Sequence, residues 1–132
     1  MVHFYRLMFL SLLLLSYAVG LTSCKSNTST GPIEVKVTVS DFKIESSVTT
    51  FTVGTTYHFV ITNKGAVDHD WMIMPQGEMD ENKNLVMLED TDLKPGVTLT
   101  KDFKFEHSGN FEFACHVEGH YEKGMHTPIT AK

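Results

Sequence analysis

The stretch Phe111-Glu-Phe-Ala-Cys115-His-Val-Glu-Gly-His120-Tyr-Glu-Lys-Gly-Met125, near the end of the chain, decides how the rest of the sequence is interpreted. Its first residues alternate between apolar and polar, which is typical of a half-buried strand. A thiol, an imidazole and a thioether follow, with four residues between Cys115 and His120 and four between His120 and Met125. The glycines before His120 and Met125 allow this loop to bend back, so that we expect the three side chains to point to one spot.

Cys115 has no expected disulfide partner, because the second cysteine of the chain, Cys24, belongs to a targeting signal. A lone thiol in an exported protein is prone to oxidation, so its surroundings must protect it or use it. Thiolate, imidazole and a weak axial thioether are ligands of blue-copper electron-transfer sites, which also have a second imidazole. The best candidate for that imidazole is His69, which follows a turn at residues 63–66 and precedes the apolar run at Trp71.

The first 23 residues resemble a secretory signal rather than part of the fold. Arg6 precedes an apolar run at residues 7–17, which is too short for a comfortable membrane-spanning helix. The ending Leu-Thr-Ser-Cys24 resembles a bacterial lipobox, in which the peptide is cut before a cysteine that is then lipidated. We therefore expect an exported protein of the cell envelope, in the periplasm or on the outer surface, anchored to a membrane through Cys24.

One folded domain is expected, at residues 33–132, after a polar tether at residues 24–32. Removal of residues 1–23 takes away one basic residue and leaves ten basic against 16 acidic residues. This acidic balance argues against nucleic-acid binding and weakly favours a basic protein partner. We expect a monomer.

The hydrophobic pattern of the domain predicts an all-β fold. Alternating or β-branched and aromatic segments, separated by Gly, Pro and Asn, indicate short strands of a β-sandwich. These segments are residues 33–39, 48–53, 57–62, 71–74, 98–105, 110–114 and 127–131. Residues 76–92 are acidic and weakly patterned, and we interpret them as an excursion in which residues 85–88 form either a helical turn or a strand.

The segments around His69 and Cys115 resemble those of the cupredoxins, the plastocyanin and azurin family. Leu93-Lys-Pro-Gly96 and the alternating segment after it also match a habitual cupredoxin segment. The spacing of four and then four residues is similar to that of rusticyanin. The resemblance implies a Greek-key β-sandwich in which His69, Cys115, His120 and axial Met125 bind one type 1 copper ion, cycling between Cu(I) and Cu(II).

Two functions remain open on this resemblance. The first is a carrier of single electrons between redox partner proteins, with the exposed edge of His120 as the usual exit route in the family. The second is a copper buffer, chaperone or resistance factor that uses the same ligands. We do not expect an enzyme, because a binuclear copper centre needs two bridging cysteines and only Cys115 is available, and the chain has no paired His-x-His motif of a multicopper oxidase.

Two residues depart from the usual cupredoxin pattern. Asp70 stands where azurin-like members commonly have an asparagine that braces the ligand loop, and a negative charge there would lower the reduction potential. His116, directly after the cysteine, is reminiscent of the Cys-His ending of multicopper oxidases. Strand alternation points its side chain away from Cys115, so we expect it on the surface or behind the metal ligands.

Overall fold

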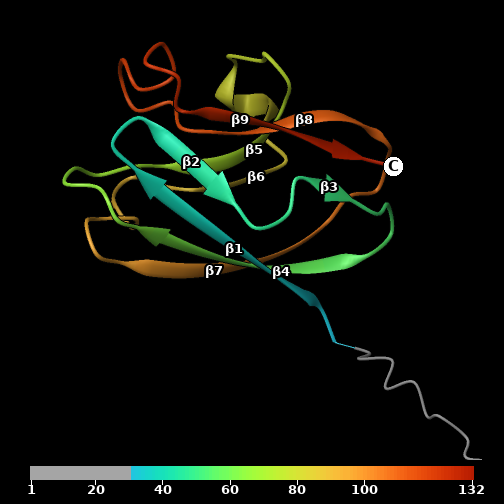
Figure 1. The fold of residues 1–132 in the computed structure, drawn as a ribbon. Helices are drawn as coiled ribbons and strands as arrows, with labels where there is room; N and C mark the ends of the chain where they lie inside the picture. Colours follow the sequence, from blue (N-terminus) through green and yellow to red (C-terminus); the bar gives the residue numbers. More distant parts are fainter. Residues whose placement is uncertain (1–30) are drawn as a thin grey trace, which may run out of the picture.

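Two β-sheets packed face to face form the domain in the computed structural model, which describes residues 31–132 (Figure 1). The expected signal at residues 1–23, the lipidated Cys24 and nearly all of the tether lie outside the described residues. The strands are β1 (Ile33–Ser40), β2 (Lys43–Ser46), β3 (Thr50–Phe51), β4 (Thr56–Asn63), β5 (Trp71–Pro75), β6 (Val86–Leu88), β7 (Thr98–Lys104), β8 (Gly109–Ala114) and β9 (His126–Ala131). A short 3₁₀ helix, η1 (Glu81–Lys83), precedes β6.

One sheet has the strand order β2-β1-β4-β7 and the other has the order β3-β9-β8-β5-β6. The pairs β1·β4 and β3·β9 are parallel, and the other pairs are antiparallel. The predicted all-β sandwich is therefore confirmed. No helix within residues 31–132 is long and apolar enough to cross a membrane.

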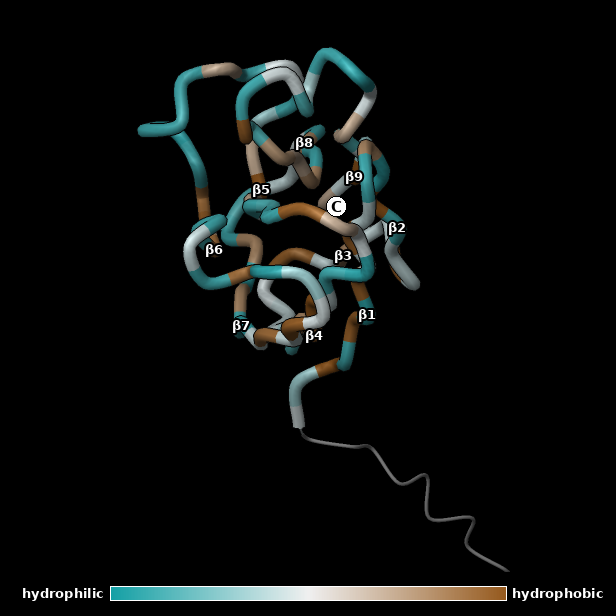
Figure 2. The backbone as a smooth tube through the Cα atoms, turned by 90° about the vertical axis from the view of Figure 1, so that its left-hand side faces the viewer, coloured by the Kyte–Doolittle hydropathy of each residue, from teal (hydrophilic) through white to brown (hydrophobic). Residues whose placement is uncertain are grey.

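The core lies between the inner faces of the two sheets. Alternate residues of β1 and β4 are buried, and Phe59 packs against Trp71 of the opposite sheet with ring centroids 5.3 Å apart. Phe113 of β8 lies beside the same two rings. In Figure 2 most hydrophobic stretches follow the strands, while the projecting loops are mostly hydrophilic. Burial of these aromatic side chains is the main contribution to stability, because each removes a large apolar area from water.

The predicted strand segments agree with the structure except where strands are very short. The segment at residues 48–53 contains only the two-residue β3, and β2 was not expected. Within residues 76–92, the chain forms η1 and then β6, so residues 85–88 contain a strand and no helical turn. Pairing with β5 explains this choice, because Met72 and Ile73 are partners of Met87 and Val86.

The β-sandwich has two distinct ends. The loop from β4 to β5 and the loop from β8 to β9 both lie at the end where β4 finishes at Asn63. The start of β1 and the C-terminus lie at the other end (Figure 1). The segments that hold the predicted ligands are therefore brought together at one end by strand topology alone.

Candidate metal centre

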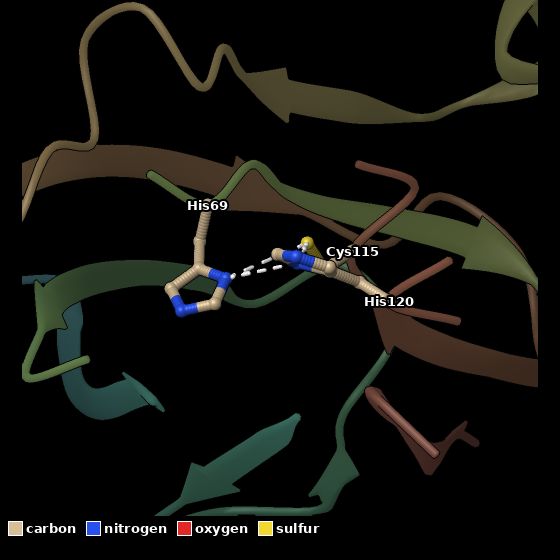
Figure 3. Close-up of side chains that lie close together, drawn as sticks. All are labelled: His69, Cys115 and His120. Atoms are coloured by element: carbon tan, nitrogen blue, oxygen red, sulfur yellow. Dashed lines mark hydrogen bonds between the residues drawn. The ribbon is translucent and has the colours of Figure 1, made fainter. Parts of the chain in front are cut away.

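Three of the predicted ligands converge at this end of the β-sandwich (Figure 3). The Cys115 Sγ atom lies 3.4 Å from His120 Nδ1 and 3.9 Å from His69 Nδ1, and the two Nδ1 atoms are 3.2 Å apart. Cys115 and His69 are fully buried, and His120 is 8% exposed. These distances suit one ion with two imidazoles and a thiolate around it, and we name these three residues the His–Cys–His cluster.

The ligand loop is folded back tightly on itself. The His120 backbone N–H donates to Val117, and the Met125 N–H donates to the His120 carbonyl. Gly119 and Gly124 adopt positive φ values of 75° and 95°, which confirms the bend that their positions predicted. The Met125 carbonyl accepts from the Cys115 N–H at 3.1 Å, so the two ends of the loop meet.

Met125, the predicted axial ligand, is fully buried and belongs to the same core cluster as Cys115. The backbone bonds of the loop place it directly beside the cysteine and histidine ligands. A buried thioether is the kind of soft sulfur donor that copper accepts as a weak fourth ligand, so Met125 could fill that position.

Burial keeps the His–Cys–His cluster neutral when no cation is present. Desolvation raises the pKa of the Cys115 thiol to about 12, with the Asp70 carboxylate adding to the shift. Desolvation also lowers the pKa values of His69 and His120. At neutral pH the site therefore presents a thiol and two imidazole lone pairs, and a bound metal ion would displace the thiol proton. The donor set fits copper on its own chemistry.

His69 is fixed by residues that the sequence did not identify. Its Nε2 atom lies 3.3 Å from Asp41 Oδ1, in the turn between β1 and β2. Asp41 also accepts from the Ala66 N–H, which joins this turn to the loop before His69. A carboxylate on the outer nitrogen fixes the ring orientation and strengthens the other nitrogen as a ligand.

Asn63 braces the loop that carries His69. Its Nδ2 donates to the carbonyls of Val67 and Leu93 at 2.8 Å, and its Oδ1 accepts from the Gly65 N–H. The residue is fully buried. The asparagine at the start of the turn therefore does the bracing, while Asp70 has another role.

Asp70 connects the two ligand segments. Its carboxylate accepts the His116 backbone N–H at 2.9 and 3.2 Å, directly after Cys115. Burial raises the pKa of this carboxyl to about 6, although the His116 N–H lowers it. The side chain is thus a buried, partly compensated carboxyl group beside the cysteine.

Phe42 covers His120, which was expected to have an exposed edge. The two rings meet edge to face with centroids 5.3 Å apart, and the Lys123 Nζ lies 4.2 Å from the centroid of the Phe42 ring. Phe42 adopts a φ of 65°, which is unusual for a large side chain and indicates a position fixed by its surroundings. Its contact with a residue 78 positions away had no local signal in the sequence.

His116 does point away from Cys115, as strand alternation predicted, but it is not on the surface. Its side chain is only 3% exposed, and the Tyr121 ring lies edge-on to it at 5.3 Å. The turn after Cys115 and the residues before β6 cover it.

The comparisons with known proteins agree with this geometry. Residues 12–127 match the model of the cupredoxin-like domain, and the chain belongs to this family. A curated relative is the copper-resistant cuproprotein CopI of Rubrivivax gelatinosus, 27% identical over 101 residues that cover 69% of this chain. The match covers 61% of that relative, so this chain spans less than two thirds of its length.

Solved structures show the same fold. Auracyanin from Roseiflexus castenholzii is 20% identical with a TM-score of 0.61, and the match covers 77% of this chain and 99% of auracyanin. Auracyanin A, a blue copper protein from Chloroflexus aurantiacus, has a TM-score of 0.63 at 18% identity, covering 77% of this chain and 100% of its own. A multi-copper oxidase from Pediococcus acidilactici matches 92% of this chain but only 30% of its own, with a TM-score of 0.53 at 17% identity.

Proposed function

We propose that the domain binds one copper ion in a type 1 site and carries single electrons between redox partner proteins. His69, Cys115 and His120 would be the three strong ligands and Met125 the axial one. The observation that carries the proposal is the convergence of two imidazole nitrogens and one sulfur within 4.8 Å in a buried site. When bound there, copper supplies a one-electron couple that needs no proton donor or substrate pocket.

The protein's own contribution is a rigid, dry ligand set. Asp41 holds the His69 ring, Asn63 holds the loop before it, and the backbone bonds of residues 115–125 hold the other donors. A fixed ligand set suits both copper oxidation states, because little rearrangement accompanies the electron. Burial also protects the thiolate from oxidation.

Copper handling is the second candidate, and the match to a copper-resistant cuproprotein favours it. The Phe42 ring, with Lys123 over it, covers His120 and so restricts the usual exit route for electrons. In this function the same ligands would hold Cu(I) for buffering or delivery. We further propose, as the N-terminal sequence indicates, that the protein acts at the cell envelope on a lipid anchor at Cys24, as a monomer without enzymatic activity.

An absorption spectrum of the protein with one equivalent of Cu(II), beside a Cys115→Ser control, tests the proposal. An intense visible thiolate-to-copper band that disappears in the variant is expected for the electron carrier. A colourless protein that still binds Cu(I) tightly would favour copper handling. If the protein bound neither Cu(I) nor Cu(II), it would share the fold of the copper-binding cupredoxins but not their metal site.

A further inference from the structure

A second group of sulfur and nitrogen donors lies on the outer face of the five-stranded sheet, away from the His–Cys–His cluster. Met72 and Met74 are fully buried on β5 and form, with Ala114, a hydrophobic cluster separate from the main core. Met87 and Tyr121 pack against this cluster. Trp71 precedes Met72, and Ile73 lies between the two methionines. Both belong to the main core, so the alternation of the strand places Met72 and Met74 on the outer face of the sheet.

The strand register brings two thioethers side by side. Met72 of β5 lies directly opposite Met87 of β6, and on its other side it lies opposite Ala114 of β8. Residues directly opposite in an antiparallel pair have Cβ atoms about 4.5–5.5 Å apart, well within reach of two methionine side chains. Met87 is only partly buried, so this pair can be reached from the edge strand β6.

An imidazole of the same face has no partner of its own. His116 lies two residues beyond Ala114, on the side of β8 opposite to Cys115. Its side chain is 3% exposed, and neither ring nitrogen has a hydrogen-bond partner among the described residues. Burial of an imidazole without a partner costs free energy, so a ligand for its nitrogen lone pair accounts for this arrangement.

Carboxylates near these donors favour a cation. The Glu81 Oε1 atom of η1 lies 3.8 Å from His116 Nδ1. Glu112 is 1% exposed, accepts from the Tyr121 hydroxyl and lies 3.6 Å from His126 Nδ1. In Figure 1, η1 lies over the outer face of the sheet, beyond β8 and β9. Glu81 therefore lies beside His116, and Glu112 lies beside Tyr121, which packs against the methionine cluster.

We propose that Met72, Met87 and His116 form a second metal site, selective for Cu(I), on the outer face of the sheet. Thioethers are soft ligands that select Cu(I), and the site is a poor one for Cu(II) because only one of its three donors, the imidazole, is a nitrogen or oxygen ligand. Strand β8 separates the two sites, because Cys115 and His116 are adjacent in the chain but face opposite sides. The domain would thus hold a redox copper and a stored Cu(I) ion.

Counting Cu(I) bound per chain tests this proposal, with a chromogenic Cu(I) chelator as competitor under anaerobic conditions. The wild type is expected to hold two Cu(I) ions per chain, and Met72→Leu/Met87→Leu is expected to hold one. Leucine conserves volume and hydrophobicity, so the fold should be kept, and circular dichroism checks this. Met79→Leu is the matched control, because Met79 is 51% exposed and lies outside the cluster, and it should still hold two.

Two further measurements keep the result independent of folding and of the type 1 site. His116→Gln should also reduce the count to one while the visible thiolate-to-copper(II) band stays unchanged. In protein labelled with ¹³C at the methionine methyl groups, a second equivalent of Ag(I), a redox-inert analogue, should shift the Met72 and Met87 resonances and leave Met79 in place. One Cu(I) ion in the wild type, or methyl shifts confined to Met125, would overturn the second site whatever the spectrum shows. A wild-type protein that holds two Cu(I) ions but shows no visible thiolate-to-copper(II) band would instead contradict the proposed electron carrier.

Discussion

Asp70 places a carboxyl group beside the cysteine of the His–Cys–His cluster, bonded to the backbone N–H that follows it. A negative charge there stabilises Cu(II) relative to Cu(I). Asp70→Asn keeps one oxygen to accept the His116 N–H but removes the charge. We expect the variant to have a higher reduction potential at neutral pH, measured by spectroelectrochemical titration of the copper-loaded protein.

Asp68→Asn is the control for this prediction. Asp68 lies on the other side of His69, 46% exposed and paired with Lys94, so solvent screens its charge. Its removal should change the potential much less. Equal shifts in the two variants would show that overall charge, and not the buried position of Asp70, sets the effect.

Phe42 controls access to His120, because its ring covers the histidine from the turn between β1 and β2. Phe42→Ala should expose the imidazole edge and increase the second-order rate constant for reaction with a small inorganic oxidant, measured by stopped flow. The visible spectrum should remain that of the wild type, since Phe42 is not a ligand. A rate constant that stays the same would mean that electrons leave the site by another route.

The ligand candidates could be predicted from the sequence because a short loop holds three of them. Cys115, His120 and Met125 are within eleven residues, and their spacing indicates the chemistry directly. Asp41 and Phe42 could not be predicted, because the fold brings them to His69 and His120 across 28 and 78 positions. The burial of His116 also depends on η1 and Tyr121, which alternation along β8 does not describe.

The turn between β4 and β5 is the element that positions His69, and Gly65 is its tightest point. A Cβ atom at Gly65 would lie 2.4 Å from Asp41 Oδ1 and 2.7 Å from His69 Nε2. Gly65→Ala should therefore displace the Asp41–His69 pair, weaken Cu(II) binding and change the visible band. A chelator competition and an absorption spectrum measure these two effects.

Gly54→Ala is the matched control for the turn. Gly54 has a φ of 80° with open space around it, and it lies at the opposite end of the β-sandwich. Alanine there should cost about 1 kcal/mol of stability through backbone strain and leave the copper spectrum unchanged. If Gly65→Ala kept the spectrum and the Cu(II) affinity of the wild type, the Asp41–His69 pair would have adapted to the added methyl group without cost.

At the scale of elements, the sequence predicts long strands well and very short ones poorly. β1 and β4 alternate over eight residues each, and their buried positions are apolar except for Asn63 at the end of β4, so the period is clear. β3 has two residues and β2 has a single buried one, so neither has a period to detect. Their existence depends on pairing with β9 and β1, which is a property of the assembled sheet.

For the whole molecule, Asp70 makes the stability of the metal-free protein depend on pH. Its carboxyl has a pKa of about 6 in the folded state against an ordinary value of 3.8, so the folded protein keeps this proton as pH rises between these values. The contribution of Asp70 to the free energy of unfolding is therefore most favourable below about pH 3.8 and is lost as the pH rises to about 6. Urea denaturation of the metal-free wild type and of the Asp70→Asn variant between pH 4 and pH 7 measures the contribution of Asp70 ionisation to stability.

We expect Asp70→Asn to gain stability relative to the wild type over that range, by on the order of 2 kcal/mol. The sign follows from the cost of ionising a buried carboxyl group, a cost that asparagine does not have. A difference between the two proteins that stays constant with pH would show that Asp70 titrates normally in the folded state.

The parallel pairing of β1 with β4 places the start of β1 at the end of the β-sandwich opposite the ligand loops. Ile33 pairs with Tyr57 at the start of β4, whereas Val39 pairs with Asn63, beside the loop that leads to His69. Any polypeptide joined before Ile33 therefore enters at the pole farthest from His120. If that polypeptide is fixed to a surface, the copper-binding loops face outward from it, and both the docking of a protein partner and the arrival of free copper ions take place from the open side.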